Sequence, residues 1–261
     1  MKVLNLEKPV IAMIHVDALP GTPKFNGDIK SIISKAQIEA KLYKDSGIDI
    51  LMIENMHDVP YLNRTAGPEI TSMMTILLYE VKNVSGLPVG LQVLAGANKQ
   101  ALGAALAAGG DFIRAEGFVY AHVADEGFFN SDAAEILRYR KQIGADNIAI
   151  FTDIKKKHSS HSITEDTSIE DTAKAAEFFM SDGVIVTGSA TGKEPSLEEI
   201  HSVKESVNIP VLAGSGITID NVSDYIKLCD ALIIGSYFKT DGKWFNPVEP
   251  DRVNKFMKKI K

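Results

Sequence analysis

The stretch Pro210–Tyr237, "PVLAGSGITIDNVSDYIKLCDALIIGSY", contains two strand-like segments that both end at small residues. The apolar run 210–213 stops at Gly214-Ser215-Gly216, and the apolar spacing after it predicts a helix over 218–229. A second apolar run, 231–234, stops at Gly235-Ser236. Small residues leave backbone N–H groups unshielded, so two such bends beside a helix N-terminus suit an anion such as phosphate. The alternative, that the glycines only permit tight turns, stays open.

The rest of the chain repeats this alternation of buried strand and amphipathic helix. Strands are expected at 10–14, 48–53, 88–94, 111–115, 147–152, 183–186, 210–213 and 231–234. The spacing of apolar residues predicts helices at 29–47, 69–84, 99–108, 132–143, 168–180, 196–207, 218–229 and 253–260. Strict alternation implies parallel strands joined by right-handed crossovers, and eight strands are enough to close a barrel.

The expected fold class is therefore α/β, a (β/α)8 TIM barrel formed by one domain over residues 1–261, because no linker or low-complexity segment divides the chain. An open doubly wound sheet would need a glycine-rich fingerprint after its first strand, and "HVDALPG" at 15–21 is not one. In (β/α)8 barrels phosphate often binds at the loops after strands 7 and 8, where the two glycine bends fall.

Composition narrows the class of protein. The chain has 45% hydrophobic and 24% charged residues, which is ordinary for a soluble globular protein. The lone Cys229 excludes an internal disulfide and suits a reducing compartment. A net charge of −6 argues against nucleic-acid binding. "MKVLNLEKPV" lacks the features of a signal peptide and no apolar run is long enough to span a membrane, so we expect a cytoplasmic protein.

Polar residues gather where the expected strands end, which is the catalytic face of such barrels. These residues are His15, Asp17, Glu54, Asn55, Gln92, Arg114, Glu116, Asp153, Lys155, Thr187 and Gly188. The opposite strand ends carry prolines and simple polar caps. We therefore expect a ligand-binding site at the first face.

Three of these positions are the strongest candidates for proton transfer. Glu54 follows an apolar strand and is the best candidate general base, although a salt bridge to Arg114 is an alternative. Asp153 and Lys155 are two residues apart and should point the same way from an extended segment. A lysine there can donate a proton, clamp an anion or form an imine, and the alternative is a structural ion pair.

The histidines give weaker signals. His15 could act in catalysis, or with Asp17 and Glu54 hold the metal of a hydrolase, but such barrels need further histidines where this chain has Thr187, so no metal is predicted. The polar segment 156–168 is expected to be an irregular, mobile loop that leaves His158 and His161 solvated. The remaining histidines have no surrounding constellation; they are His57, His122 and His201.

Several stretches together resemble the BtpA family, which is named for a photosystem I biogenesis protein. They are "MIHVDALPGTP" (13–23), "IENMHDVPY" (53–61), "AGPEIT" (66–71), "DFIRAEGFV" (111–119), "FTDIKKKH" (151–158), "VTGSATGKEPSLEEI" (186–200), "LAGSGIT" (212–218) and "IIGSYFKTDGKWFNPVEPDRV" (233–253). The resemblance implies a (β/α)8 fold and a role in photosystem assembly in phototrophs. The family pattern has asparagines at the ends of strands 3 and 4, where this chain has Gln92 and Glu116. The spacing of Asp153 and Lys155 also resembles the orotidine-decarboxylase group, but His158 replaces its next aspartate, so we infer no decarboxylase chemistry.

Two hypotheses about function follow. The first is an isomerase or lyase that binds a small phosphorylated molecule through the glycine bends and Gly188, while Asp17, Asn55 and Arg114 position its polar body. It needs no cofactor, because the sequence has no motif for a redox cofactor or a nucleoside triphosphate. The second is a non-catalytic assembly factor that binds protein partners at a membrane complex, which would include peripheral membrane association. A homo-oligomer formed through the outer helices is compatible with either.

Overall fold

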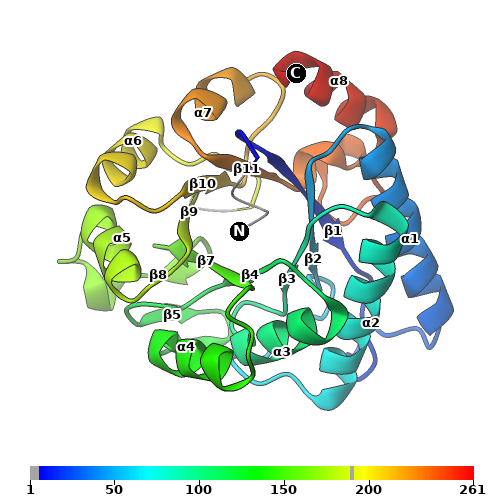
Figure 1. Cartoon of the computed structure of the whole chain (residues 1–261), viewed down its shortest axis with the longest axis horizontal. Helices are drawn as coiled ribbons and strands as arrows, with labels where there is room; N and C mark the ends of the chain where they lie inside the picture. The colour runs from blue at the N-terminus through cyan, green and yellow to red at the C-terminus, as the bar shows by residue number, and fades with distance from the viewer. Residues whose placement is uncertain (1–5, 189–190) are drawn as a thin grey trace.

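Eight parallel strands close into a barrel that is surrounded by eight helices, within the residues described by the computed structural model, 6–188 and 191–261 (Figure 1). The strands neighbour one another in the order β1-β11-β10-β9-β7-β4-β3-β2, and all the pairs are parallel. The predicted (β/α)8 barrel is thus confirmed. Residues 1–5 of "MKVLNLEKPV" and residues Ser189 and Ala190 of the stretch 186–200 lie outside the described residues.

The barrel strands agree closely with the sequence prediction. They are β1 (Val10–His15), β2 (Ile50–Glu54), β3 (Val89–Gln92), β4 (Phe112–Ala115), β7 (Ala149–Ile154), β9 (Gly183–Thr187), β10 (Val211–Gly214) and β11 (Ala231–Ile234). Apart from Glu54, whose side chain is partly exposed, every residue in them is buried. Burial on both faces explains why the strands read as continuous apolar runs.

The eight helices of the described residues are α1 (Ile29–Asp45), α2 (Pro68–Ser85), α3 (Asn98–Ala108), α4 (Ala133–Gln142), α5 (Ile169–Phe178), α6 (Leu197–Ser206), α7 (Val222–Leu228) and α8 (Pro250–Ile260). Three of the eight, α1, α5 and α6, begin at a residue whose side chain caps the helix. The Ser168 and Ser196 hydroxyls accept from the backbone N–H groups three residues on. None of these helices, as far as the described residues go, is long and apolar enough to cross a membrane.

Helix α7 is shorter than predicted, because it begins at Val222 and not at Thr218. The Asn221 side-chain oxygen accepts from the Thr218 backbone N–H at 2.8 Å. This local bond stabilises a turn over 218–221 that competes with helix. The prediction of a helix N-terminus directly behind the first glycine bend is therefore wrong.

A small antiparallel sheet stands where irregular loops were expected. It consists of β5 (His122–Ala124), β6 (Gly127–Phe129) and β8 (Ser159–Ser160), in the order β6-β5-β8, followed by the 3-10 helix η2 (Ser162–Thr164). The rings of His122 and Phe129 stack across β5 and β6, with centroids 5.1 Å apart. The loops after β4 and β7 are therefore joined to each other, which corrects the expectation of an irregular segment over 156–168.

Two large rings belong to the apolar cluster inside the barrel, and each faces a glycine. Phe112 and Phe151 lie edge to face with centroids 5.4 Å apart. A Cβ atom on Gly90 would lie 2.1 Å from Cζ of Phe112, and one on Gly183 would lie 2.8 Å from Cδ1 of Phe151. The glycines therefore make the space that the rings occupy.

Replacing Gly90 by alanine should destabilise the barrel by about 1–3 kcal/mol, because the added methyl group overpacks the core. The measurement is urea unfolding of the variant beside the wild-type protein. In a Phe112→Leu background the same change should cost much less, since the ring that it meets is gone. An equal cost in both backgrounds would show that the clash with Phe112 is not the cause.

Candidate active site

A cavity of about 440 Å³ opens at the carboxyl ends of the barrel strands. One part of its wall is charged and comes from β2, β4 and the loop after β7; it includes Glu54, Arg114, Glu116 and Lys157. Another part is formed by the bends after β10 and β11, with Ser215, Gly216, Gly235 and Ser236. Tyr61 and Trp244 add aromatic surface. The cavity has the size of a small-molecule site.

Arg114 is held against this wall by a two-point ion pair. Its Nε and Nη2 donate to the two carboxylate oxygens of Asp153 at 2.7 and 2.6 Å. The two side chains are only 6% and 0% exposed. Burial disfavours the charge on Arg114, but the Asp153 carboxylate prevails and raises the pKa of the guanidinium above its ordinary value. Asp153 therefore fixes Arg114 and does not itself line the cavity. The alternative salt bridge from Arg114 to Glu54 is not found among the described residues.

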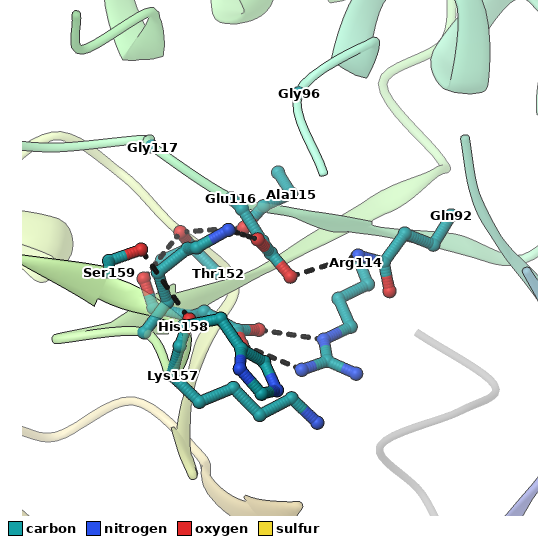
Figure 2. A network of polar contacts seen from close by, with 12 residues as sticks. Gln92, Gly96, Arg114, Ala115, Glu116, Gly117, Thr152, Lys157, His158 and Ser159 are labelled. Carbon is teal, nitrogen blue, oxygen red and sulfur yellow. Dashed lines mark hydrogen bonds and ion pairs between the residues drawn. The ribbon is translucent and has the colours of Figure 1, made fainter. Parts of the chain in front are cut away.

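Glu116 forms a second pair with Lys156, across 2.6 Å. Its other carboxylate oxygen accepts from Gln92 Nε2 at 3.1 Å, and Figure 2 shows the side chains of Gln92 and Glu116 facing each other. Burial opposes both charges, but their attraction lowers the pKa of Glu116 and raises that of Lys156. The Gln92 carbonyl oxygen is buried without a hydrogen-bond partner among the described residues, so it is available to accept from a ligand.

The three consecutive lysines 155–157 have different surroundings. Lys155 follows the last residue of β7 with φ of 45°, and its amine donates to the Thr164 carbonyl oxygen at 2.8 Å. Lys155 does not line the cavity, so its predicted role there has no support in this geometry; the left-handed turn at Lys155 ends the strand alternation on which the prediction rested. Lys156 binds Glu116, and Lys157 lines the cavity.

Lys157 is one of the cavity residues that the sequence analysis missed, as are Tyr61, Trp244 and Arg252. Figure 2 shows its side chain extending on the same side as Arg114. In the part of the chain that the structure describes, no hydrogen bond or ion pair within 4 Å involves its amine. Burial and then repulsion by Arg114 lower the pKa of Lys157. The feature of the sequence that could have indicated Lys157 is the run of three lysines directly after β7.

Glu54 and His15 face each other across the cavity wall, with Oε2 and Nε2 3.7 Å apart. His15 Nδ1 lies 3.2 Å from the Trp244 carbonyl oxygen, which can only accept, so Nδ1 carries the hydrogen and Nε2 keeps its lone pair. Burial and then Lys239 lower the pKa of His15 well below its ordinary value, and burial raises the pKa of Glu54. The pair thus combines a neutral imidazole with a carboxyl group that holds its proton unusually well.

Asp17 turns away from the cavity. Its carboxylate lies 2.6 Å from the Lys35 amine on α1, and both side chains are more than a third exposed. The metal-hydrolase alternative thus has no convergence of His15, Asp17 and Glu54. No group of three potential metal-binding side chains occurs in residues 6–188 and 191–261. The expected contribution of Asp17 to ligand binding has no support in this geometry.

Asn55 lines the cavity, and both ends of its amide form hydrogen bonds within the protein. Its Nδ2 donates to Asp58 at 2.7 Å, and its Oδ1 accepts from the Leu94 backbone N–H at 2.7 Å. Asp58 also accepts from the Leu19 backbone N–H at 2.8 Å. Asn55 therefore joins the loops after β1, β2 and β3 and gives the mouth of the barrel a fixed shape.

The two glycine bends lie side by side at the cavity, because β10 and β11 are neighbours in the barrel. Ser215 and Gly216 have φ of 78° and 65°. Among the described residues, no backbone hydrogen bond uses the N–H groups of Gly216, Gly235 or Ser236. These three N–H groups remain as donors for the expected anion site. The helix N-terminus does not contribute, because α7 begins six residues after Gly216.

Three further residues of the expected anion site do not line the cavity. Thr187 and Gly214 end β9 and β10 and are buried. Gly188 is covered by the next loop, since a Cβ atom there would lie 2.2 Å from the Lys193 carbonyl oxygen. The predicted contact of these three residues with a ligand therefore has no support in this geometry.

The histidines expected to be solvated have partners. His158 Nε2 accepts from the Thr191 backbone N–H at 3.1 Å, and His161 Nε2 donates to the Lys156 carbonyl oxygen at 2.9 Å. The His57 ring packs against Trp244, with centroids 4.8 Å apart, and His122 stacks on Phe129. These contacts join loops around the cavity, whereas His201 is exposed on α6.

The fold and the site together define a (β/α)8 barrel protein with a charged cavity at the carboxyl ends of its strands. The chain belongs to the BtpA family, whose model matches residues 6–261. A mitochondrial protein of Caenorhabditis elegans is 48% identical over 99% of this chain and 95% of its own length. Photosystem I biogenesis protein BtpA of Synechocystis is 31% identical over 95% of this chain and 86% of its own length.

A solved structure of the same fold is (S)-3-O-geranylgeranylglyceryl phosphate synthase from Thermoplasma acidophilum, in complex with its substrate sn-glycerol-1-phosphate. It superposes with a TM-score of 0.62 and 14% identity, over 100% of this chain and 96% of that one. At this identity the structural likeness shows the fold alone, whereas the match to the family model confirms the family resemblance noted from the sequence.

Proposed function

We propose that the protein is an enzyme, of the isomerase or lyase class, that binds a small phosphorylated molecule in this cavity and transfers protons on it. The observation that carries the proposal is one continuous cavity whose wall includes both the glycine bends and the charged groups at the ends of β2 and β4. A phosphate at the bends would leave the rest of a small ligand facing those groups.

The phosphate end is supported by donors and by charge. The N–H groups of Gly216, Gly235 and Ser236 are backbone donors at neighbouring bends, and such groups bind anions well. Arg252 also lines the cavity, and its Nε donates to the Tyr237 carbonyl oxygen at 2.7 Å. This arginine supplies a positive charge next to the second bend. The barrel from Thermoplasma acidophilum, which holds a glycerol phosphate, gives the proposal a precedent in the same fold.

The reactive end is supported by the Glu54–His15 pair. Burial raises the pKa of Glu54, so its carboxyl group keeps a proton to higher pH than an exposed glutamate, and isomerisation and elimination next to a carbonyl require a group that takes up and returns a proton. Arg114 offers a permanent positive charge for the negative charge that develops on oxygen in such steps.

Inorganic phosphate and a panel of sugar phosphates should stabilise the protein against thermal unfolding. A ligand at about 100 times its Kd adds about 2.7 kcal/mol. The Arg252→Leu variant should bind phosphate about tenfold more weakly, since it loses one charge-assisted contact. Arg138→Leu is the matched control, because Arg138 is exposed on α4 away from the cavity. No stabilisation by any compound of the panel, or equal losses in both variants, would contradict the proposal.

A second candidate function, partner binding without catalysis, is favoured by one surface feature. Phe178, Phe179 and Met180 are consecutive at the end of α5 and are 83%, 43% and 66% exposed. Exposed apolar clusters of this kind often mark protein interfaces. The test is to express the chain in Synechocystis in place of BtpA. An assembly factor would lose function in Phe178→Ser and keep it in Glu54→Gln, and an enzyme would show the reverse.

A further inference from the structure

We propose that the Lys157 amine forms an imine with a carbonyl group of the ligand, which makes the substrate a phosphorylated aldehyde or ketone. The phosphate part of this inference rests on the proposed function, whereas the amine chemistry can be tested separately.

The three lysines of the run 155–157 differ in what holds their amines. Lys155 donates to the Thr164 carbonyl oxygen outside the cavity, and Lys156 is neutralised by Glu116 at 2.6 Å. Lys157 lines the cavity, and in the described chain its amine has no carboxylate within 4 Å. An amine attacks a carbonyl carbon only in its neutral form and only when its lone pair is not engaged. Of the three, Lys157 is the one whose amine lies at the cavity with no hydrogen bond or ion pair from the described residues to engage its lone pair.

The surroundings of Lys157 favour the neutral form. Its position in the cavity wall partly shields the amine from water, and the guanidinium of Arg114 repels a second positive charge, so the pKa is lowered for both reasons. Arg114 cannot relieve this repulsion by moving away, because Asp153 holds it at two points. The buried Arg114–Asp153 pair therefore keeps a fixed positive charge near the Lys157 amine.

Glu54 is the group that can supply the protons of the reaction. It lines the same cavity, and its pKa is raised by burial, against the opposite effects of Arg114 and Lys157. Glu54 and Lys157 thus lie close enough for the charge of each to affect the ionisation of the other.

The chemistry balances with these groups alone. The Lys157 nitrogen attacks the carbonyl carbon, a C–N bond forms, and the carbonyl oxygen receives a proton that the nitrogen gives up, which yields a carbinolamine. The C–O bond then breaks, and the hydroxyl group leaves as water with the proton of the Glu54 carboxyl group. The products are a protonated imine, one water molecule and the Glu54 carboxylate. That carboxylate is then in place to accept a proton from the carbon next to the imine.

Reductive trapping tests the inference. The protein is incubated with glyceraldehyde 3-phosphate or dihydroxyacetone phosphate, the imine is reduced with borohydride, and the modified lysine is located by peptide mass spectrometry. We expect Lys157 to be labelled at least tenfold more than Lys155 or Lys156. Lys157→Arg, which keeps the charge but cannot form the adduct, should lose this label, and Lys155→Arg should keep it.

Two comparisons separate this inference from the proposed function. Inorganic phosphate should slow labelling by glyceraldehyde 3-phosphate, and unphosphorylated glyceraldehyde should label Lys157 much more slowly. If phosphate compounds bind but Lys157 is labelled no more than surface lysines, the imine is overturned and the proposed function stands. If Lys157 is labelled equally with and without the phosphate group, the imine is supported and the phosphate end of the proposed function is overturned.

Discussion

Replacing Arg114 by methionine should lower the free energy of unfolding by about 3–5 kcal/mol, because it leaves the Asp153 carboxylate buried without its partner. Asp153 is fully buried and receives both of its ion-pair bonds from this one guanidinium. The same variant should also lose ligand binding, since Arg114 lines the cavity. Urea unfolding at pH 7 measures the first effect, and ligand-induced thermal shift measures the second.

The double variant Arg114→Met/Asp153→Leu distinguishes a broken ion pair from lost packing. Removing both charges should recover most of the stability, because apolar residues of similar size often replace a buried pair without loss. Lys141→Met provides a surface control: Lys141 and Asp146 lie 3.3 Å apart but are largely exposed, so its unfolding curve should hardly change. A double variant as unstable as Arg114→Met would mean that the unpaired carboxylate is not the source of the loss.

The barrel was predictable from the sequence because its strands are buried on both faces. Continuous apolar runs such as 10–14 and 231–234 have a single physical explanation in a chain of alternating strands and helices. The face of the barrel that carries the candidate site was also predictable, because the carboxyl ends of parallel strands all lie on the same side. Glu54, Arg114 and Glu116 were placed in the cavity for that reason.

The positions of individual side chains at the site could not be predicted, because they depend on the conformation of single residues after each strand ends. Lys155 adopts a left-handed conformation, and this one turn moves Lys155 out of the cavity and allows Lys157 to enter it. Asp17 was expected at the site because it follows β1, but it pairs with Lys35 on the next helix. The α7 boundary was misplaced for a similar reason, because the Asn221 side chain stabilises a turn where apolar spacing indicates helix. Strand periodicity carries no information about such local contacts.

The charged groups around the cavity fall into two sets, those that form ion pairs with one another and those whose ionisation burial opposes. Arg114 and Lys156 are each paired with one carboxylate, Asp153 and Glu116. Once these pairs are set aside, the ionisable groups that remain around the cavity include Glu54, His15 and Lys157. The pKa of each of these three is shifted, mainly by burial, toward the neutral form. Groups that change protonation easily are those that proton transfer and imine formation require.

Replacing Glu54 by glutamine should therefore slow proton transfer by about 10²–10⁴-fold while leaving ligand affinity nearly unchanged. The measurement is deuterium incorporation from D₂O into the carbon next to the carbonyl of a bound phosphorylated ketone, chosen by the binding screen. Glutamine keeps the size and the hydrogen-bonding edge of glutamate but cannot take up a proton. Wild-type exchange rates in Glu54→Gln would contradict the role of Glu54.

The same substitution should stabilise the protein at neutral pH. Burial raises the folded-state pKa of Glu54 above 4.5, so the folded chain holds this proton more tightly than the unfolded chain does. As the pH rises from 4.5 through the folded-state value, the unfolded chain loses its proton first, and wild-type stability falls relative to the glutamine variant. Urea unfolding of both proteins from pH 4 to pH 8 should show curves that diverge in this direction. A carboxyl group stabilised in its ionised form would make the curves diverge the other way, and Glu54 would then be a structural partner of Arg114 and Lys157, with no part in moving protons.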